Sequence, residues 1–255
     1  MIITRYGCAV DGVGLTELDP SIIVTDIQES APALRAATAE GVDDGLRLLR
    51  LKRPALSVAV TFEVHEYDPA RRKAVALKVC GWAREGWLTL SDRPGQRLRV
   101  VCDRLPAVTS ALRWTEPLTV GFVAYGLPYW QESRPATAAF TGREGSVSLS
   151  PAGTADCFLE AAITAREPVD ALTLTAGGRT LTLRGLGMRP GDALTIGYEG
   201  EAHRQYLRVG ERSALGCRSA DSADDLLLCP RKPNPVGIAA DGTVSAALRA
   251  HGLWL

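Results

Sequence analysis

The sequence is poor in the residues and motifs on which most enzymes and metal sites depend. It has three histidines, His65, His203 and His251, and they lie far apart, so no His-x-x-x-His or His-Glu-x-x-His unit is present. A Gly-x-Ser-x-Gly nucleophile motif and the glycine-rich phosphate-binding motifs are also missing. Because no nucleophile is paired with a base, we expect no catalytic residue, no metal ligand and no cofactor, and therefore no enzyme.

The chain also lacks an excess of charge of either sign. It contains 29 basic and 29 acidic residues, and its pI is about 6.8. A general nucleic-acid binder needs a basic excess to neutralise phosphates, so this class is excluded. No apolar run approaches the roughly 18 residues of a membrane helix, and we expect no contact with a membrane. The first residues carry no apolar segment of signal-peptide length, which predicts folding in a reducing cytosol.

Cysteine is present without a pattern. No two of the six cysteines form a Cys-x-x-Cys unit, and no histidine stands at ligand spacing beside one. In a reducing compartment we expect reduced thiols, most of them buried. The six are Cys8, Cys80, Cys102, Cys157, Cys217 and Cys229.

Two small charged clusters and five tryptophans leave alternatives open. The basic run 71–73 is typical of a solvated helix face, and a phosphate site is the alternative. The acidic residues Asp221, Asp224 and Asp225 lack the glycine and closing glutamate of a calcium loop, so a solvated loop is favoured over a loose cation site. The tryptophans could stack on sugars, although burial is their commoner role.

Hydrophobic periodicity predicts a mainly β protein in two parts. At 255 residues the chain has room for two domains of about 130 residues each. Residues 56–64 alternate strictly between apolar and polar, which predicts a strand. Residues 2–5, 22–27, 87–90 and 96–102 are further predicted strands, with a turn at Asp11–Gly12. Asp68 followed by Pro69 predicts the start of a short helix that runs to about Gly81.

The segment 30–52 allows two structures. Its alanine, leucine and arginine content favours a helix, but Gly41 and Gly45 interrupt it and no continuous apolar stripe is present. An extended two-stranded arm is equally allowed by the residues. We predict the hairpin arm, with Ala36, Gly41, Gly45, Leu48 and Leu51 among its residues.

The stretch 118–132 predicts the end of the first domain. Leu118, Val120, Phe122 and Ala124 alternate with other residues up to Tyr125, as in a strand with one buried face. Pro128 cannot donate to a sheet, so we expect the strand to close one sheet, with aromatic residues packed over its end as a stopper. The predicted stopper is formed by Tyr129 and Trp130, which follow Pro128, while Phe122 and Tyr125 belong to the predicted strand.

The second half has short predicted strands separated by turn signals. Residues 146–149, 156–164, 172–175, 180–183, 193–198, 205–209, 226–228, 236–239 and 244–248 are the predicted strands. Gly177–Gly178 and Asp241–Gly242 are predicted hairpin turns. This spacing is typical of an antiparallel β-sandwich. We therefore predict domains at 1–134 and 146–255, joined by a small, polar linker at 135–145.

Over nearly its whole length the chain resembles the distal tail proteins (Dit) of long non-contractile-tailed phages and related prophages. The resemblance rests on the order and spacing of several segments, none of them catalytic. They are 25–32, the strand with Val58, Val60 and Phe62, Trp82 just past the helix, 120–130, 153–155, the Gly177–Gly178 hairpin, 186–192, 234–238 and Trp254.

The resemblance implies a fold, an assembly and a set of partners. The fold would be an N-terminal β-sandwich-like domain with one short helix and a hairpin arm, followed by a galectin-like or carbohydrate-module-like antiparallel β-sandwich. Six copies would form a ring at the virion tail tip, assembled in the host bacterial cytoplasm, and only this resemblance implies that the arm residues named above contact the next subunit. The ring would join the tail tube and tape measure proteins to the hub or tip protein, and a receptor-binding protein or a cell-surface glycan are further partners. DNA would pass through its lumen as cargo. The alternative is a carbohydrate-binding module with an accessory domain.

Overall fold

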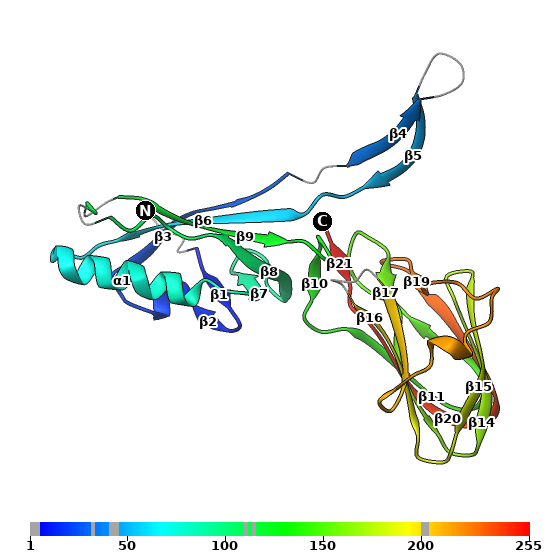
Figure 1. The fold of residues 1–255 in the computed structure, drawn as a ribbon. Helices are drawn as coiled ribbons and strands as arrows, with labels where there is room; N and C mark the ends of the chain where they lie inside the picture. Colours follow the sequence, from blue (N-terminus) through cyan, green and yellow to red (C-terminus); the bar gives the residue numbers. More distant parts are fainter. Residues whose placement is uncertain (1–5, 32–33, 41–45, 110–111, 114–115, 200–203) are drawn as a thin grey trace. The chain divides into compact units, whose positions relative to one another are not determined.

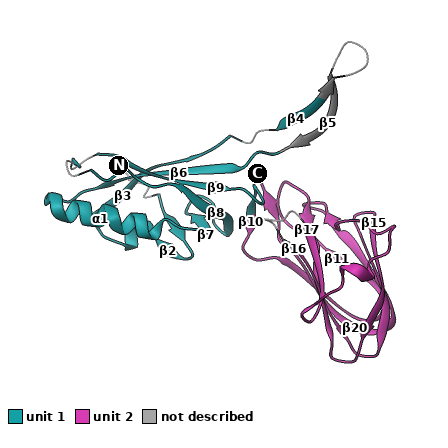
Figure 2. Ribbon diagram, viewed as in Figure 1, with its two compact units in different colours: residues 1–130 teal, residues 131–255 magenta. Residues whose placement is uncertain are grey.

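The computed structural model describes residues 6–31, 34–40, 46–109, 112–113, 116–199 and 204–255. The chain divides into two compact units, residues 1–130 and 131–255 (Figure 2). The strands of both units pair antiparallel, so the predicted mainly β fold class is confirmed. None of the described helices has the length and apolarity that crossing a membrane requires.

The described residues of unit 1 form one α-helix and a twisted sheet (Figure 1). Its main sheet has the strand order β2-β1-β7-β8-β9-β6-β3. Its elements are β1 (Cys8–Val10), β2 (Val13–Gly14), the 3-10 helix η1 (Leu15–Glu17), β3 (Ile22–Glu29), β4 (Arg35–Glu40), β5 (Leu46–Lys52), β6 (Leu56–Val64), α1 (Pro69–Trp82), β7 (Gly86–Leu90), β8 (Gln96–Arg104) and β9 (Leu118–Ala124), followed by β10 (Trp130–Glu132) at the unit boundary.

The core of unit 1 lies between α1 and the sheet. The predicted helix is confirmed, and the Asp68 carboxylate caps it by accepting a hydrogen bond from the Ala70 N–H at 3.0 Å. Its last residue, Trp82, packs edge-on against Phe122 with ring centroids 5.9 Å apart and donates its Nε1–H to the Val13 carbonyl. The alternating apolar residues of the predicted strand 56–64 fill the other side of this core, because every second residue of β6 from Val58 onward is buried.

The strand β9 is central, which corrects the prediction that it closes the sheet. It pairs with β6 on one edge and with β8 on the other. From Val120 to Ala124 every residue is buried, so both faces of the strand are covered and the expected alternation disappears. Pro128 does not constrain this strand, because β9 ends four residues before it at Ala124. The predicted first strand at 2–5 lies outside the described residues.

Unit 2 is a sandwich built around two long strands. Its sheet order is β15-β14-β20-β13-β16-β17-β18, and β11 pairs with the free edge of β20. The elements are β11 (Ala136–Leu149), β12 (Cys157–Phe158), β13 (Glu160–Ala165), β14 (Val169–Ala176), β15 (Arg179–Met188), β16 (Ala193–Glu199), β17 (Arg204–Val209), β18 (Arg212–Ser213), the 3-10 helix η2 (Leu215–Cys217), β19 (Leu227–Leu228), β20 (Asn234–Ala250) and β21 (Leu253–Trp254).

The strand β20 runs through Asp241–Gly242 without a turn, so the predicted hairpin at this dipeptide is wrong. Its first half pairs with β14 and its second half with β13, while β11 follows its other edge along the whole length. The β11–β20 ribbon therefore pairs with two groups of strands, the one that contains β14 and the one that contains β13. Asp241 stabilises the transition between them, because its carboxylate accepts hydrogen bonds from the N–H groups of Asp170 and Ala171.

Glu167 stabilises the same point of β20 through Thr243, on the other side of Asp241–Gly242. Its Oε2 accepts hydrogen bonds from the Thr243 N–H at 2.9 Å and the Thr243 hydroxyl at 2.8 Å, and it pairs with Arg143. The hydrogen bond from the Thr243 N–H is the main reason why the pKa of Glu167 falls from 4.5 to about 2. The register of β11 shifts between Gly142 and Glu144, opposite this point. The hydrogen bonds of Asp241 and Glu167 and the β-bulge in β11 thus allow the β11–β20 ribbon to pair with β14 along one half and with β13 along the other.

The predicted linker at 135–145 is also wrong. Residues 136–145 belong to β11, which pairs with β20 from Ala136↔Ala250 to Leu149↔Asn234. The boundary between the units instead falls between Trp130 and Gln131, so the predicted domains 1–134 and 146–255 need shifting toward the N-terminus. The residues looked like a linker because an edge strand exposes most of its side chains, and β11 is exposed or half-buried up to Ser148.

Candidate assembly arm and surfaces of the two units

The segment between β3 and β6 forms the predicted hairpin. β4 and β5 pair antiparallel in a two-stranded sheet of their own, with Ala36 opposite Leu51 and Thr38 opposite Leu48. The predicted tip residues Gly41 and Gly45 lie outside the described residues. A two-stranded hairpin without further strands is at best marginally stable in water. We therefore expect this hairpin to gain stability from contact with a partner.

The base of the arm is held by backbone and side-chain contacts to unit 1. The Ser30 N–H donates to the Ser57 carbonyl at 2.8 Å, and the Ser57 N–H donates to the Ser30 hydroxyl at 3.0 Å. Past Ser30 the chain becomes exposed, and Leu34 keeps 55% of its surface in solvent. The point at which the arm leaves the main sheet is thus fixed at the end of β3.

Glu29, the last residue of β3, forms a clamp beside this point. Its carboxylate accepts two hydrogen bonds from Arg93, from Nε at 2.7 Å and Nη2 at 3.0 Å, and one from Trp130 Nε1 at 2.9 Å. The Arg93 guanidinium also lies over the Trp130 ring, 5.0 Å from its centroid. The sequence prediction did not single out Glu29 or Arg93, although Glu29 lies in the stretch 25–32 that carries the family resemblance.

The predicted aromatic stopper is only partly a packed group. Trp130 is fully buried, as expected. Tyr129 is half-buried beneath the guanidinium of Arg53, whose Cζ lies 5.4 Å from the ring centroid. Tyr125, predicted as the last residue of the strand, lies just past the end of β9 at Ala124 and keeps 64% of its surface exposed. Pro128 lies in the connection that follows β9, where it needs no ladder partner.

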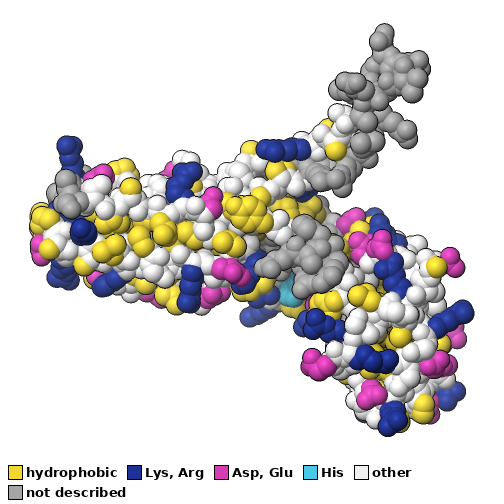
Figure 3. Space-filling model, in the orientation of Figure 1, with side chains coloured by type: hydrophobic (Ala, Val, Ile, Leu, Met, Phe, Trp, Pro, Cys, Tyr) yellow, Lys and Arg dark blue, Asp and Glu magenta, His cyan; other side chains and the backbone are white. Residues whose placement is uncertain are grey.

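The face of the unit 1 sheet opposite α1 is buried along the central strand β9 and partly exposed on β3 and β8. Small and β-branched residues occupy neighbouring positions across β3, β6, β9 and β8, for example Thr61 opposite Thr119 and Val101 opposite Val123. Ile23 and Val101 are 39% and 41% exposed on it. Figure 3 shows further apolar side chains on the side of unit 1 along which α1 runs. Such a surface suits contact with another protein.

The basic run 71–73 is split between the surface and the interior of unit 1, and two carboxylates of the acidic loop, Asp224 and Asp225, are paired with arginines. Arg71 pairs with Glu66, whereas Arg72 turns into unit 1 and is buried, so the basic run does not form one phosphate-facing surface. In the acidic loop, Asp224 pairs with Arg218 and Asp225 with Arg179. The hydrogen bond from Arg218 lowers the pKa of Asp224 below its ordinary value. Within the described residues, no group of three or more potential ligands could hold a metal ion.

The described histidines and the thiols show no arrangement for catalysis. His65 lies beside Glu63, and the His251 ring nitrogen Nδ1 lies 2.7 Å from the Glu132 carbonyl oxygen. All six cysteines are free thiols, and burial raises the pKa of Cys8 and of Cys157 to about 12. Thiols with raised pKa values are poor nucleophiles.

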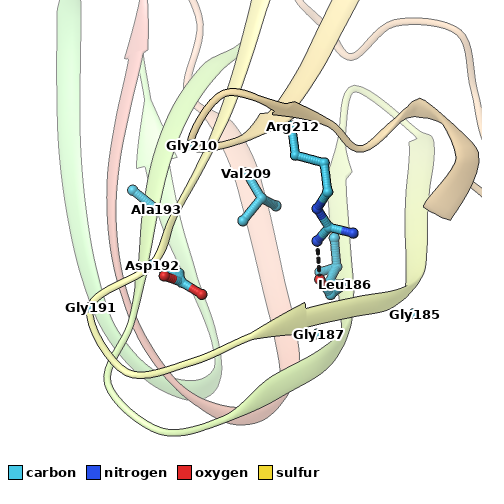
Figure 4. A pocket seen from close by; sticks show the side chains of 9 residues that line it. All are labelled: Gly185, Leu186, Gly187, Gly191, Asp192, Ala193, Val209, Gly210 and Arg212. Atoms are coloured by element: carbon cyan, nitrogen blue, oxygen red, sulfur yellow. Dashed lines mark hydrogen bonds between the residues drawn. The ribbon is translucent and has the colours of Figure 1, made fainter.

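A pocket of about 550 Å³ lies at one end of unit 2, between the β15–β16 and β17–β18 connections (Figure 4). Its walls are mostly backbone, and the glycines that line it include Gly185 and Gly187 with positive φ. Its two charged side chains already bind the backbone: Arg212 donates to the Leu186 carbonyl, and Asp192 accepts from the Arg189 N–H at 2.8 Å. These contacts give both groups a structural role in joining neighbouring turns.

Comparison with solved structures identifies the type of fold. The chain has the fold of a phage distal tail protein, over both of its units. The SPP1 Dit (gp 19.1) protein, described as a paradigm of the hub adsorption apparatus in phages that infect Gram-positive bacteria, matches with a TM-score of 0.71. The match has 12% sequence identity and covers 98% of this chain and 99% of that chain.

A second solved structure supports the same fold. A chain of the phage P2 baseplate, in its activated conformation with Ca, matches with a TM-score of 0.50 and 5% identity over 97% of both chains. No protein-family model and no curated protein matches this sequence. The resemblance predicted from the sequence is thus confirmed at the level of the fold.

Proposed function

We propose that the protein is a structural, non-enzymatic component of a phage tail tip and forms part of a baseplate hub in the virion. The observation that carries this proposal is the match to the SPP1 Dit protein over nearly the whole of both chains. Separate matches to two common β-sandwich domains would not carry it, because such domains serve many functions. Here one match covers 98% of the chain and therefore both units.

Within this function, the β4–β5 arm is the assembly element. The hairpin pairs with no other strand of the described chain, so its backbone edges are available to another copy. A contact from the arm of one copy to the main sheet of the next is heterologous, and its repetition closes a ring when the rotation between copies divides a full turn. We propose a homo-hexamer with a lumen wide enough for DNA to pass.

The proposed partners follow from this location. The ring would contact the tail tube and tape measure proteins on one side and the hub or tip protein on the other, and unit 2 would face a receptor-binding protein or a cell-surface glycan. The balanced charge of the chain suits a lumen that releases DNA, because a basic lining would bind the phosphates.

The arm provides the decisive experiment. The full chain and a variant in which residues 36–48 are replaced by a short Gly-Ser linker are compared by native mass spectrometry and negative-stain electron microscopy. The full chain is expected to form six-membered rings, and the variant is expected to remain a folded monomer. The substitution Leu215→Ser, at a residue of unit 2 that is 46% exposed, serves as the control and should leave the rings intact.

Two outcomes would overturn the assignment of the arm. Rings formed equally well by the arm variant would show that the hairpin is dispensable. A full chain that stays monomeric at high concentration, both alone and with its tail tube partner, would contradict the ring itself.

A further inference from the structure

One arginine on the β7–β8 hairpin of unit 1 lacks a hydrogen-bonding partner among the described residues. Arg97 lies on β8, where Leu98 and Val100 are buried in the core, so Arg97 and Arg99 lie on the opposite face of the sheet. The Nε atom of Arg97 is enclosed and donates to no acceptor, and no carboxylate in the described part of the chain pairs with its guanidinium. The residue as a whole is only half-buried, so a partner can reach it.

Trp87 of β7 holds this guanidinium in place. The Cζ atom of Arg97 lies 4.0 Å from the centroid of the Trp87 ring. A cation over an indole ring is attracted by the negative face of the ring. The backbone of Trp87 is itself fixed, because its N–H donates to the Asp11 carboxylate at 2.9 Å and β7 pairs with β8 through Trp87 and Arg99. The Arg97 cation is therefore positioned before any partner binds.

Arg99, on the same strand and the same face, differs from Arg97 in one respect. Its guanidinium pairs with the Glu85 carboxylate. It also lies farther from the indole, with Cζ 5.9 Å from the ring centroid. The charge of Arg99 is thus already compensated, whereas that of Arg97 is not. An unpaired and partly buried cation costs free energy, which a carboxylate from another molecule would recover.

An exposed apolar residue extends the same face of β8. Val101 is 41% exposed, although its register partner Val123 on β9 is buried. Tryptophan and arginine are the residues most enriched among those that dominate the binding energy of protein interfaces. The Trp87–Arg97 pair beside Val101 therefore suits a polypeptide that brings both a carboxylate and an apolar side chain.

The arm strands of a neighbouring copy suit this place poorly. In sequence, β4 and β5 contain four basic residues and one acidic residue. Their net charge has the same sign as Arg97, so they are better matched to an acidic surface. They are Arg35, Arg47, Arg50 and Lys52 against Glu40.

We propose that the Trp87–Arg97 pair binds a carboxylate side chain on an extended, acidic segment of another protein. The carboxylate would accept hydrogen bonds from the forked guanidinium, and the indole would keep that fork in position. Because four residues separate Arg97 from Val101 on β8, the carboxylate and the apolar residue of an extended partner would also be four positions apart. The inference gives the chemistry of one partner of the proposed hub and rests in that sense on the proposed function.

A peptide titration of the full chain tests the pair. The probe is a capped hexapeptide of three glutamates followed by three valines, which contains the required spacing, and binding is followed by saturation-transfer difference NMR. We expect a dissociation constant of about 1 mM or below. The same peptide with glutamine in place of glutamate should bind at least about tenfold more weakly, because it lacks the charge that Arg97 compensates.

Substitutions in the chain distinguish a positioned guanidinium from a general positive charge. Arg97→Gln should weaken binding by about tenfold, and Arg97→Lys should weaken it as well, because lysine keeps the charge but loses the planar fork. Arg99→Gln is the matched control and should bind within about twofold of the unaltered chain, since Glu85 already occupies its charge. The urea midpoint of unit 1 should not fall in Arg97→Gln, because the enclosed Nε donates no hydrogen bond that could be lost.

Several outcomes would overturn the inference. They are no binding of the glutamate peptide at about 10 mM, equal binding by Arg97→Lys, an equal loss in Arg99→Gln, and tighter binding of inorganic phosphate than of the peptide. Loss of rings in Arg97→Gln would also overturn it, because the carboxylate would then come from a second copy. Rings without peptide binding would refute this inference and leave the proposed function standing, whereas peptide binding by a chain that forms no rings would do the reverse.

Discussion

Removal of the Glu29 carboxylate should destabilise unit 1 at the base of the arm. Glu29→Ala leaves the indole N–H of Trp130 without its acceptor in a position where the side chain is fully buried. A hydrogen bond to a charged group contributes about 1.5–3 kcal/mol. The Arg93 side chain is 26% exposed and the Glu29 side chain 22% exposed, so their bidentate pair adds about 1 kcal/mol after solvent screening. We expect the free energy of unfolding of unit 1 to fall by about 2–4 kcal/mol.

A double-mutant cycle tests the origin of this loss. Trp130→Phe removes the indole donor, so Glu29→Ala in that background should cost only the contribution of Arg93. The coupling between the two substitutions should be about 1–2 kcal/mol. Urea titrations read by hydrogen exchange and mass spectrometry follow unit 1 and unit 2 through separate peptides. Glu85→Ala, which breaks the exposed pair with Arg99, is the control and should cost no more than about 1 kcal/mol. A coupling below about 0.5 kcal/mol would refute the reasoning.

Three further predictions concern single groups. Asn234→Ala should destabilise unit 2 by about 2–4 kcal/mol, because the buried amide satisfies four backbone contacts at 2.7–3.2 Å; an unchanged urea midpoint would contradict this. For Glu167, whose pKa is lowered in the folded state, the stabilisation is complete above its ordinary pKa of 4.5 and is lost as the pH falls from 4.5 toward about 2. The advantage of the unaltered chain over Glu167→Gln in urea should therefore shrink across that interval, and a constant difference would disprove the contribution of this carboxylate. Cys8 and Cys157 should resist iodoacetamide at neutral pH until the protein unfolds, and mass spectrometry that finds either thiol labelled in the native state would contradict their raised pKa values.

Local signals in the sequence predicted the elements whose stability is also local. The alternation of residues 56–64 predicted β6, and the Asp68–Pro69 pair predicted the start of α1. For these two elements the residues that decide the structure are neighbours in the chain, so periodicity and capping are sufficient. The hairpin arm is different, because its residues allow a helix equally and the family resemblance decided between the two structures.

The errors lie where distant strands decide the outcome. Asp241–Gly242 has the composition of a hairpin turn, yet it continues a strand because β11 pairs with both sides of it and the Asp241 carboxylate binds the N–H groups of β14. The contact between Glu29 and Trp130 joins residues 101 positions apart, and no sequence spacing predicts it.

The long ribbon in unit 2 sets an order of events during synthesis. Its two strands, β11 at 136–149 and β20 at 234–250, are separated by most of the unit, and β13 and β14 both need β20 as their neighbour. Unit 1, in contrast, has all its residues by position 130. On the ribosome, unit 1 can therefore reach its native state while unit 2 remains an open chain. Since strands that pair across a long loop form slowly and leave edges exposed, the time between the emergence of β11 and that of β20 is the interval in which nascent copies are most exposed to aggregation.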